Sequence, residues 1–118
     1  MKDMNKQSIG IDATGKSLGR IASESARYLQ GKHLPSYKPN VPASVQVEVV
    51  NITSANANKK SSDLKVLYRS SMRPGGLKQT SFLDAFEKNP RETFRNIVAG
   101  MLPKNKLRKI LLKHLTIR

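Results

Sequence analysis

The spacing of hydrophobic residues changes several times along the chain, and each change predicts a new element. Over 7–13, two isoleucines alternate with polar residues, which predicts a short strand. From Leu18 onward, apolar residues recur at intervals of three and four, which predicts an amphipathic helix that ends at Gly31. Asp12 or Thr14 would cap the exposed N–H groups at the start of this helix. The first thirty residues therefore predict a strand followed by a helix.

The middle of the chain alternates strand-like and irregular segments. Residues 45–52 are rich in valine and contain one charged residue, which predicts an interior strand. Residues 64–69 show a second, shorter alternation. Prolines and polar residues predict basic or polar loops over 31–44 and 53–63, and residues 1–6 are expected to be a flexible N-terminus.

The last forty residues have helical periodicity. A capping box at Ser81 predicts the start of a short helix, and Asn89 with Pro90 predicts the start of a longer one. A third helix is expected over 107–114, and residues 115–118 are expected to form a closing strand. Strands interleaved with helices favour an α/β sandwich, with parallel strands where the connections cross over.

Composition indicates the partner. The chain has 118 residues, the size of one domain, with 22 Lys and Arg, 8 Asp and Glu and a formal net charge of +14. The strong positive electrostatic field of such a chain favours binding to a nucleic acid, which is a polyanion. No apolar run is long enough to span a membrane, and no apolar segment near the start resembles an export signal. We therefore expect neither membrane insertion nor export.

Side chains that would support a metal site or catalysis are scarce. The chain contains no cysteine, and its two histidines, His33 and His114, are far apart in sequence. Its acids are scattered, and no serine is placed beside a histidine and an acid. We therefore expect no catalytic residues, no metal site, no cofactor and no small-molecule substrate.

One motif suggests a different function. Residues 10–17, GIDATGKS, match the phosphate-loop pattern G-x-x-x-x-G-K-[ST] at every fixed position. However, Gly10 falls inside the predicted strand rather than after it, and the strand at 45–52 has no magnesium-binding Asp at its end. A strand-to-helix turn is the preferred interpretation, and nucleotide binding remains the third hypothesis.

Three segments together resemble a known family. DATGKSLGRIAS at 12–23, RPGGLK at 73–78 and GMLPKNKL at 100–107 resemble the signature segments of ribosomal protein L13 of the large subunit, bacterial or organellar type. The resemblance covers roughly residues 8–117, and GMLPKNKL is its most specific part. It implies a single domain over 1–118, with a three-layer α/β/α sandwich around a four-stranded, mainly parallel sheet.

The resemblance also implies a function. It predicts a structural constituent of the large ribosomal subunit, not an enzyme, that binds and helps assemble large-subunit rRNA through basic loops and a basic C-terminal helix. Neighbouring large-subunit proteins would be its other partners. The expected location is the ribosome in the cytoplasm, and an organellar ribosome is left open.

Candidate rRNA-binding residues lie at predicted loops, at a helix start and along one helix face, where phosphates can reach them. Arginines near the glycine turn are favoured because Arg binds phosphate through two bonds and stacks on bases. Tyr37 offers a ring for stacking, although a tyrosine packed at the domain edge is an equal alternative. The candidates are Lys16, Arg20, Lys32, Tyr37, Lys38, Arg69, Arg73, Gly75, Gly76, Lys78, Lys104, Asn105, Lys106, Arg108, Lys109 and Lys113.

A DNA-binding protein is the second hypothesis. The helices predicted over 90–101 and 107–115, joined by a short turn, resemble a helix-turn-helix. The second helix, however, offers Lys, Arg and His as polar groups and no Asn or Gln to read adenine. That composition suits phosphates better than base edges.

Overall fold

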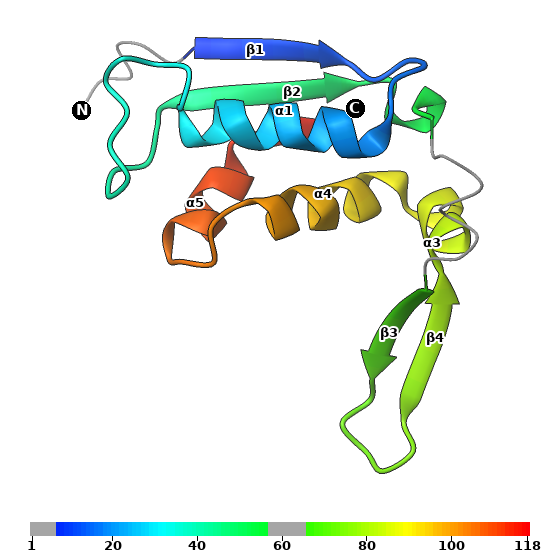
Figure 1. The fold of residues 1–118 in the computed structure, drawn as a ribbon. Helices are drawn as coiled ribbons and strands as arrows, with labels where there is room; N and C mark the ends of the chain where they lie inside the picture. Colours follow the sequence, from blue (N-terminus) through cyan, green and yellow to red (C-terminus); the bar gives the residue numbers. More distant parts are fainter. Residues whose placement is uncertain (1–6, 57–65) are drawn as a thin grey trace.

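The computed structural model describes residues 7–56 and 66–118, which form an α/β body and a projecting β-hairpin (Figure 1). In chain order the elements are β1 (Gln7–Asp12), α1 (Leu18–Gln30), β2 (Val45–Val50), the 3-10 helix η1 (Ile52–Ser54), β3 (Val66–Ser70), β4 (Leu77–Ser81), α3 (Phe82–Lys88), α4 (Pro90–Met101), α5 (Leu107–Lys113) and β5 (Leu115–Ile117).

The sheet of the body has three parallel strands in the order β1-β2-β5. Central strand β2 buries Val45, Val47 and Val49 on one face, as expected of valines flanked by strands on both sides. The register pairs Val47 with both Ile9 and Leu115. The predictions of an interior strand and of a closing strand at the C-terminus are therefore confirmed.

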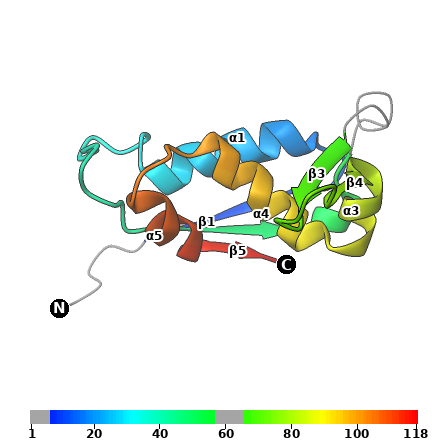
Figure 2. The same ribbon diagram turned by 90° about the horizontal axis from the view of Figure 1, so that it is seen from below.

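The sheet differs from the four-stranded, three-layer arrangement that the family resemblance implies. In the described part of the chain the helices lie on one face of a three-stranded sheet (Figures 1 and 2). The other face is lined by polar side chains such as Gln46 and Thr116, and Glu48 there pairs with Arg118 at 2.9 Å. Because this face offers no apolar stripe, it provides no hydrophobic surface on which a second helical layer could pack.

Helices α1 and α4 form the core beneath the sheet. Ile21 and Leu29 of α1 and Phe94 and Val98 of α4 are almost completely buried. Helix α1 ends at Gly31 as predicted, and the φ of 74° at this glycine is the left-handed conformation common at helix ends. The amphipathic patterns thus predict the buried faces of α1 and α4, except that Met101, expected on the buried face of α4, is 41% exposed.

The predicted helix starts differ in how they are capped. Ser81 accepts a hydrogen bond from the Asp84 N–H at 3.2 Å, which confirms the cap of α3. Asn89 and Pro90 begin α4 as predicted, but the Asn89 side chain makes no capping bond. The expected cap of α1 is wrong, because Ser17 occupies the cap position and makes no side-chain bond there.

The strand-like residues 66–70 pair with 77–81 instead of joining the sheet. This antiparallel hairpin, β3–β4 (residues 66–81, hereafter the hairpin), projects from the α3 end of the body (Figure 1). A tight turn places the two segments together at little cost in chain entropy, which favours local pairing. The hydrophobic pattern does not predict β4, because LKQTS contains one apolar residue and buries none.

Three predictions fall partly or wholly outside the described residues. These are the flexible N-terminus over 1–6, most of the polar loop over 53–63, and the start of the strand predicted over 64–69. The described part of that loop forms η1 and a bridge between Asn56 and Ser17.

Candidate nucleic-acid interface

Positive charge is concentrated in two stretches of the chain that pack together. Residues 25–47 and 93–118, hereafter the acid-free region, contain ten Lys and Arg and no Asp or Glu. Packing of α1 on α4 and pairing of β2 with β5 join the two stretches. The loop over 31–44 and helix α5 lie at the same end of the body in two views (Figures 1 and 2). Among the described residues, the loop and α5 therefore present positive charge from segments that contain no Asp or Glu, whereas Arg118 at the end of β5 pairs with Glu48.

Tyr37 and Lys38 lie where the loop meets α5. Together with Asn105 they line a small groove of about 30 Å³ between the loop and residues 103–111. They also border a larger pocket of about 640 Å³, formed by the loop, the end of α1 and Gln7. Tyr37 is 40% exposed, so its ring borders both hollows while remaining accessible to a ligand.

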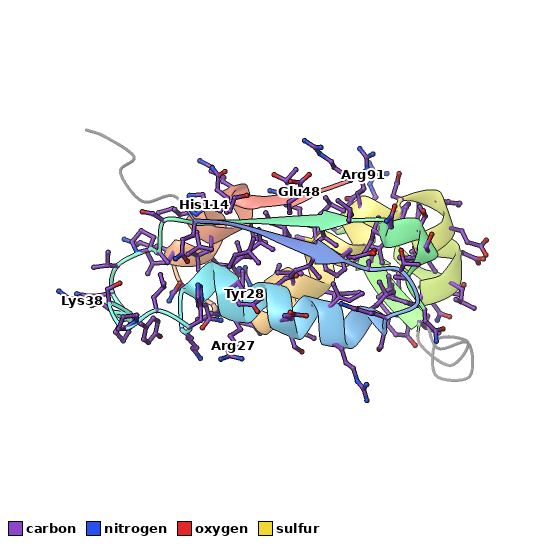
Figure 3. The ribbon with its side chains drawn as sticks, turned by 90° about the horizontal axis from the view of Figure 1, so that it is seen from above. Arg27, Tyr28, Lys38, Glu48, Arg91 and His114 are labelled. Atoms are coloured by element: carbon purple, nitrogen blue, oxygen red, sulfur yellow. The ribbon has the colours of Figure 1, made fainter. Side chains whose placement is uncertain are left out.

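Arg27 is a candidate that the sequence prediction missed. It lines a surface hollow with Lys32 and Met101, at the junction of α1, the loop and the end of α4. Figure 3 shows Arg27, Lys38 and His114 toward one end of the molecule and Arg91 toward the other. In the sequence, Arg27 is simply a polar residue of an amphipathic helix, and only the fold brings it to the basic surface.

The predicted rRNA-binding residues are accessible but form three separate groups. All are exposed except Gly76 and Arg108, which are half-buried. One group, in the acid-free region, contains Lys32, Tyr37, Lys38, Lys104, Asn105, Lys106, Arg108, Lys109 and Lys113; the second, on the hairpin, contains Arg69, Arg73, Gly75, Gly76 and Lys78; the third, at the start of α1, contains Lys16 and Arg20.

Asn105 has a structural role as well. Its side-chain Oδ1 accepts a hydrogen bond from the Leu107 N–H at 3.0 Å, and its backbone carbonyl accepts one from the Arg108 N–H at 3.2 Å. These bonds satisfy N–H groups at the start of α5. The side-chain oxygen of Asn105 thus organises the turn that presents the neighbouring lysines.

The hairpin carries its own positive charge. Residues 66–81 contain two arginines, one lysine and no acid. Arg69 and Lys78 lie directly opposite each other in the strand register. A groove of about 580 Å³ lies between the hairpin base and α3 and α4, with Leu67, Tyr68 and Arg69 among its lining residues.

The phosphate-loop motif does not form an open anion cradle. Such a cradle needs backbone N–H groups directed at a ligand. Here the N–H groups of residues 13–16 all donate within the chain: Ala13 to the Val50 carbonyl at 3.0 Å, Thr14 to Asp12 Oδ1 at 3.0 Å, Gly15 to the Ser54 carbonyl at 3.1 Å and Lys16 to the Ala13 carbonyl at 3.1 Å. GIDATGKS therefore matches the phosphate-loop motif in sequence but not in backbone geometry.

Asp12 organises this turn instead of capping α1. Its carboxylate accepts hydrogen bonds from the Thr14 N–H, from the Thr14 hydroxyl at 2.8 Å and from Asn51 Nδ2 at 3.3 Å. These bonds, the one from the Thr14 N–H above all, lower the pKa of Asp12 below its ordinary value of 3.8. Asp12 thus links the end of β1 to the residue that follows β2.

The geometry of α4 and α5 differs from that of a helix-turn-helix. Helix α5 has seven residues, buries Leu111 and leads directly into β5, which pairs with β2. Its exposed face carries Lys109 and Lys113, which suit phosphates rather than base edges. Here α5 serves as the last connection of the α/β body.

Two further classes of site find no support in the described residues. Within 7–56 and 66–118, no helix has the length and apolar character needed to cross a membrane. In the same residues, no group of three acids or histidines is gathered where it could hold a metal ion.

Comparison with known proteins assigns the chain to a family. Residues 6–117 match the family model described as ribosomal protein L13. The chain belongs to the ribosomal protein L13 family. Among its relatives is a large ribosomal subunit protein uL13 from Kineococcus radiotolerans, 40% identical over 115 residues, which cover 98% of this chain and 78% of the relative.

Two further relatives of this L13-family protein give the same result. The large ribosomal subunit protein uL13 of Carboxydothermus hydrogenoformans is 42% identical over 107 residues, or 91% of this chain and 75% of the relative. That of Aquifex aeolicus is 43% identical over 107 residues, or 91% of this chain and 74% of the relative. The resemblance carried by the three signature segments is confirmed. The L13 family is one of structural components rather than enzymes.

Proposed function

We propose that this protein is a structural constituent of the large ribosomal subunit that binds and helps assemble large-subunit rRNA. Its family and its bacterial relatives, each named a large ribosomal subunit protein, support this role. Its partners would be large-subunit rRNA and neighbouring large-subunit proteins, in a cytoplasmic ribosome, and residues 1–118 would act as one domain.

The observation that carries the proposal is the acid-free region. The lysines and arginines of the loop over 31–44 and of residues 104–113 repel one another, so their assembly at one end of the body is favoured when a polyanion neutralises them. RNA carries a row of phosphates along its backbone. Such a row fits cations that are spread over a loop, a helix and a helix end, whereas a single small anion would need one compact pocket.

We assign the contacts by type. The exposed lysines of the acid-free region, together with Lys16 and Arg20 at the start of α1, would contact phosphates as point charges. Arg69, Arg73 and Lys78, on the hairpin, would contact phosphates beside the Gly75–Gly76 turn. Arg27 joins this set because it shares a hollow with Lys32.

Cosedimentation and salt titration test the role. The protein should sediment with the large subunit, and the logarithm of its affinity for transcribed bacterial large-subunit rRNA should fall linearly with the logarithm of salt concentration. Replacing Lys104, Lys106 and Lys109 with Gln should reduce that slope by about 2–3, since each phosphate contact contributes roughly 0.7–0.9.

Lys88→Gln is the matched control. Lys88 is also an exposed lysine, but it lies on α3 together with Asp84 and Glu87. Its loss should leave the slope unchanged. A wild-type protein that remains free of the large subunit, or a triple variant with the wild-type slope, would contradict the proposal.

A further inference from the structure

The hairpin has two chemically different faces. Residues that lie directly opposite in an antiparallel pair share a face, and successive residues alternate between faces. The register therefore puts Arg69 and Lys78 on one face, hereafter called the basic face. Tyr68 and Leu77 lie on the other face, hereafter called the apolar face. The alternation of Tyr68 and Arg69 follows from the predicted strand, whereas only the observed pairing places Lys78 beside Arg69 and Leu77 near Tyr68.

The apolar face is exposed to an unusual degree. Tyr68 is 63% exposed and Leu77 is 60% exposed, and they are diagonal neighbours because Tyr68 pairs with Gln79. At the turn, Met72 is 92% exposed and has a positive φ of 66°. These side chains stabilise no core of this chain, so their apolar surface is available to a partner.

The basic face indicates what that partner is. Like charges directly opposite on paired strands destabilise a hairpin, and the hairpin contains no acid to offset Arg69 and Lys78. A phosphate between or beside the two cations removes this repulsion. The same partner should meet the apolar face, and a nucleobase has a flat apolar surface on which a tyrosine ring stacks.

We propose that the hairpin inserts into folded rRNA, with Arg69 and Lys78 on phosphates and the exposed ring of Tyr68 stacked on an unpaired nucleobase beside Leu77. This inference rests on the proposed function and adds a base contact to it. The two faces point in opposite directions, so RNA must surround the hairpin on both sides.

Salt titration separates the two faces. With the full chain and transcribed bacterial large-subunit rRNA, Tyr68→Ala should weaken binding by about 5- to 100-fold and leave the salt slope unchanged. Tyr68→Phe should bind like wild type, whereas Tyr68→Leu, which keeps apolar area but lacks an aromatic plane, should behave like Tyr68→Ala. Arg69→Gln should instead reduce the salt slope by about 0.7–0.9.

Crosslinking gives a second readout. Ultraviolet irradiation of the wild-type complex, followed by mass spectrometry, should yield a nucleotide attached to a peptide containing Tyr68. All variants should unfold at the wild-type denaturant concentration, because Tyr68 is mostly exposed.

Two results would overturn the inference while leaving the proposed function intact. One is wild-type rRNA affinity in Tyr68→Ala; if that variant also loses a neighbouring ribosomal protein, the apolar face binds protein instead. The other is wild-type affinity in Tyr68→Leu, which would indicate a non-aromatic contact. By contrast, a wild-type chain without rRNA affinity would overturn the proposed function itself.

Discussion

The body and the hairpin use hydrophobic residues for opposite purposes. In the body, Phe94, Ile21 and Val47 are at most 1% exposed and stabilise the chain's own fold. In the hairpin, Tyr68 and Leu77 are more than half exposed and stabilise little of it. The comparison shows that hydrophobicity alone does not mark a core residue. What distinguishes the two is whether the chain supplies a covering surface, and for the hairpin we assign that surface to RNA.

The sharpest way to break this comparison is to remove one large apolar side chain from each region. Phe94→Ala leaves a cavity in the core and should lower the free energy of unfolding by about 3–5 kcal/mol. Met72→Ala, at the 92% exposed turn, should change it by less than about 0.5 kcal/mol. Urea denaturation of the free proteins measures both. Similar losses in the two variants would show that the hairpin is part of the core.

Two glycines with nearly the same backbone conformation, one in the body and one in the hairpin, allow a finer comparison of the two regions. Gly31 in the body and Gly75 in the hairpin have φ of 74° and 73°, so alanine at either position should cost about 1–2 kcal/mol of strain. At Gly31 the added Cβ would also lie 2.6 Å from the Ala43 Cβ, whereas at Gly75 it meets nothing within 4 Å. Gly31→Ala should therefore lower the free energy of unfolding, measured with urea, by about 1–3 kcal/mol more than Gly75→Ala does. Equal losses would contradict the difference in packing.

The smallest expected effect concerns the turn after β1. Because the folded-state pKa of Asp12 is lowered, its contribution to stability is fully present above its ordinary value of 3.8 and is lost as pH falls through the lower folded-state value. Asp12→Asn should therefore be less stable than wild type at pH 7, and the difference should shrink below about pH 4. Denaturation across pH measures it. A difference that stays constant with pH would exclude the charged carboxylate as its source.

Sequence periodicity predicted most of the body, because each of its elements has a buried face. The valines of β2 and the apolar stripes of α1 and α4 give their positions within a few residues. Elements without a buried face were predicted poorly. Strand β4 has one apolar residue, and the cap of α1 was assigned to Asp12 or Thr14, which the fold instead joins to each other and, through Asp12, to Asn51. The candidate site follows the same rule, since charge counts identified its lysines but not Arg27 or Tyr68.

By itself the sequence determined the charge of the protein, the acid-free stretches and the helices and strands whose spacing is local. The tertiary structure alone decided that 66–70 pairs with 77–81 rather than with the sheet, that the described helices lie on one face of the sheet, and that the loop over 31–44 meets α5. The reason is physical. Periodicity records which side of an element avoids water, whereas the choice of strand partner depends on a competition between loop closure and burial across the whole chain. The position of Arg69 directly opposite Lys78 is one outcome of that competition.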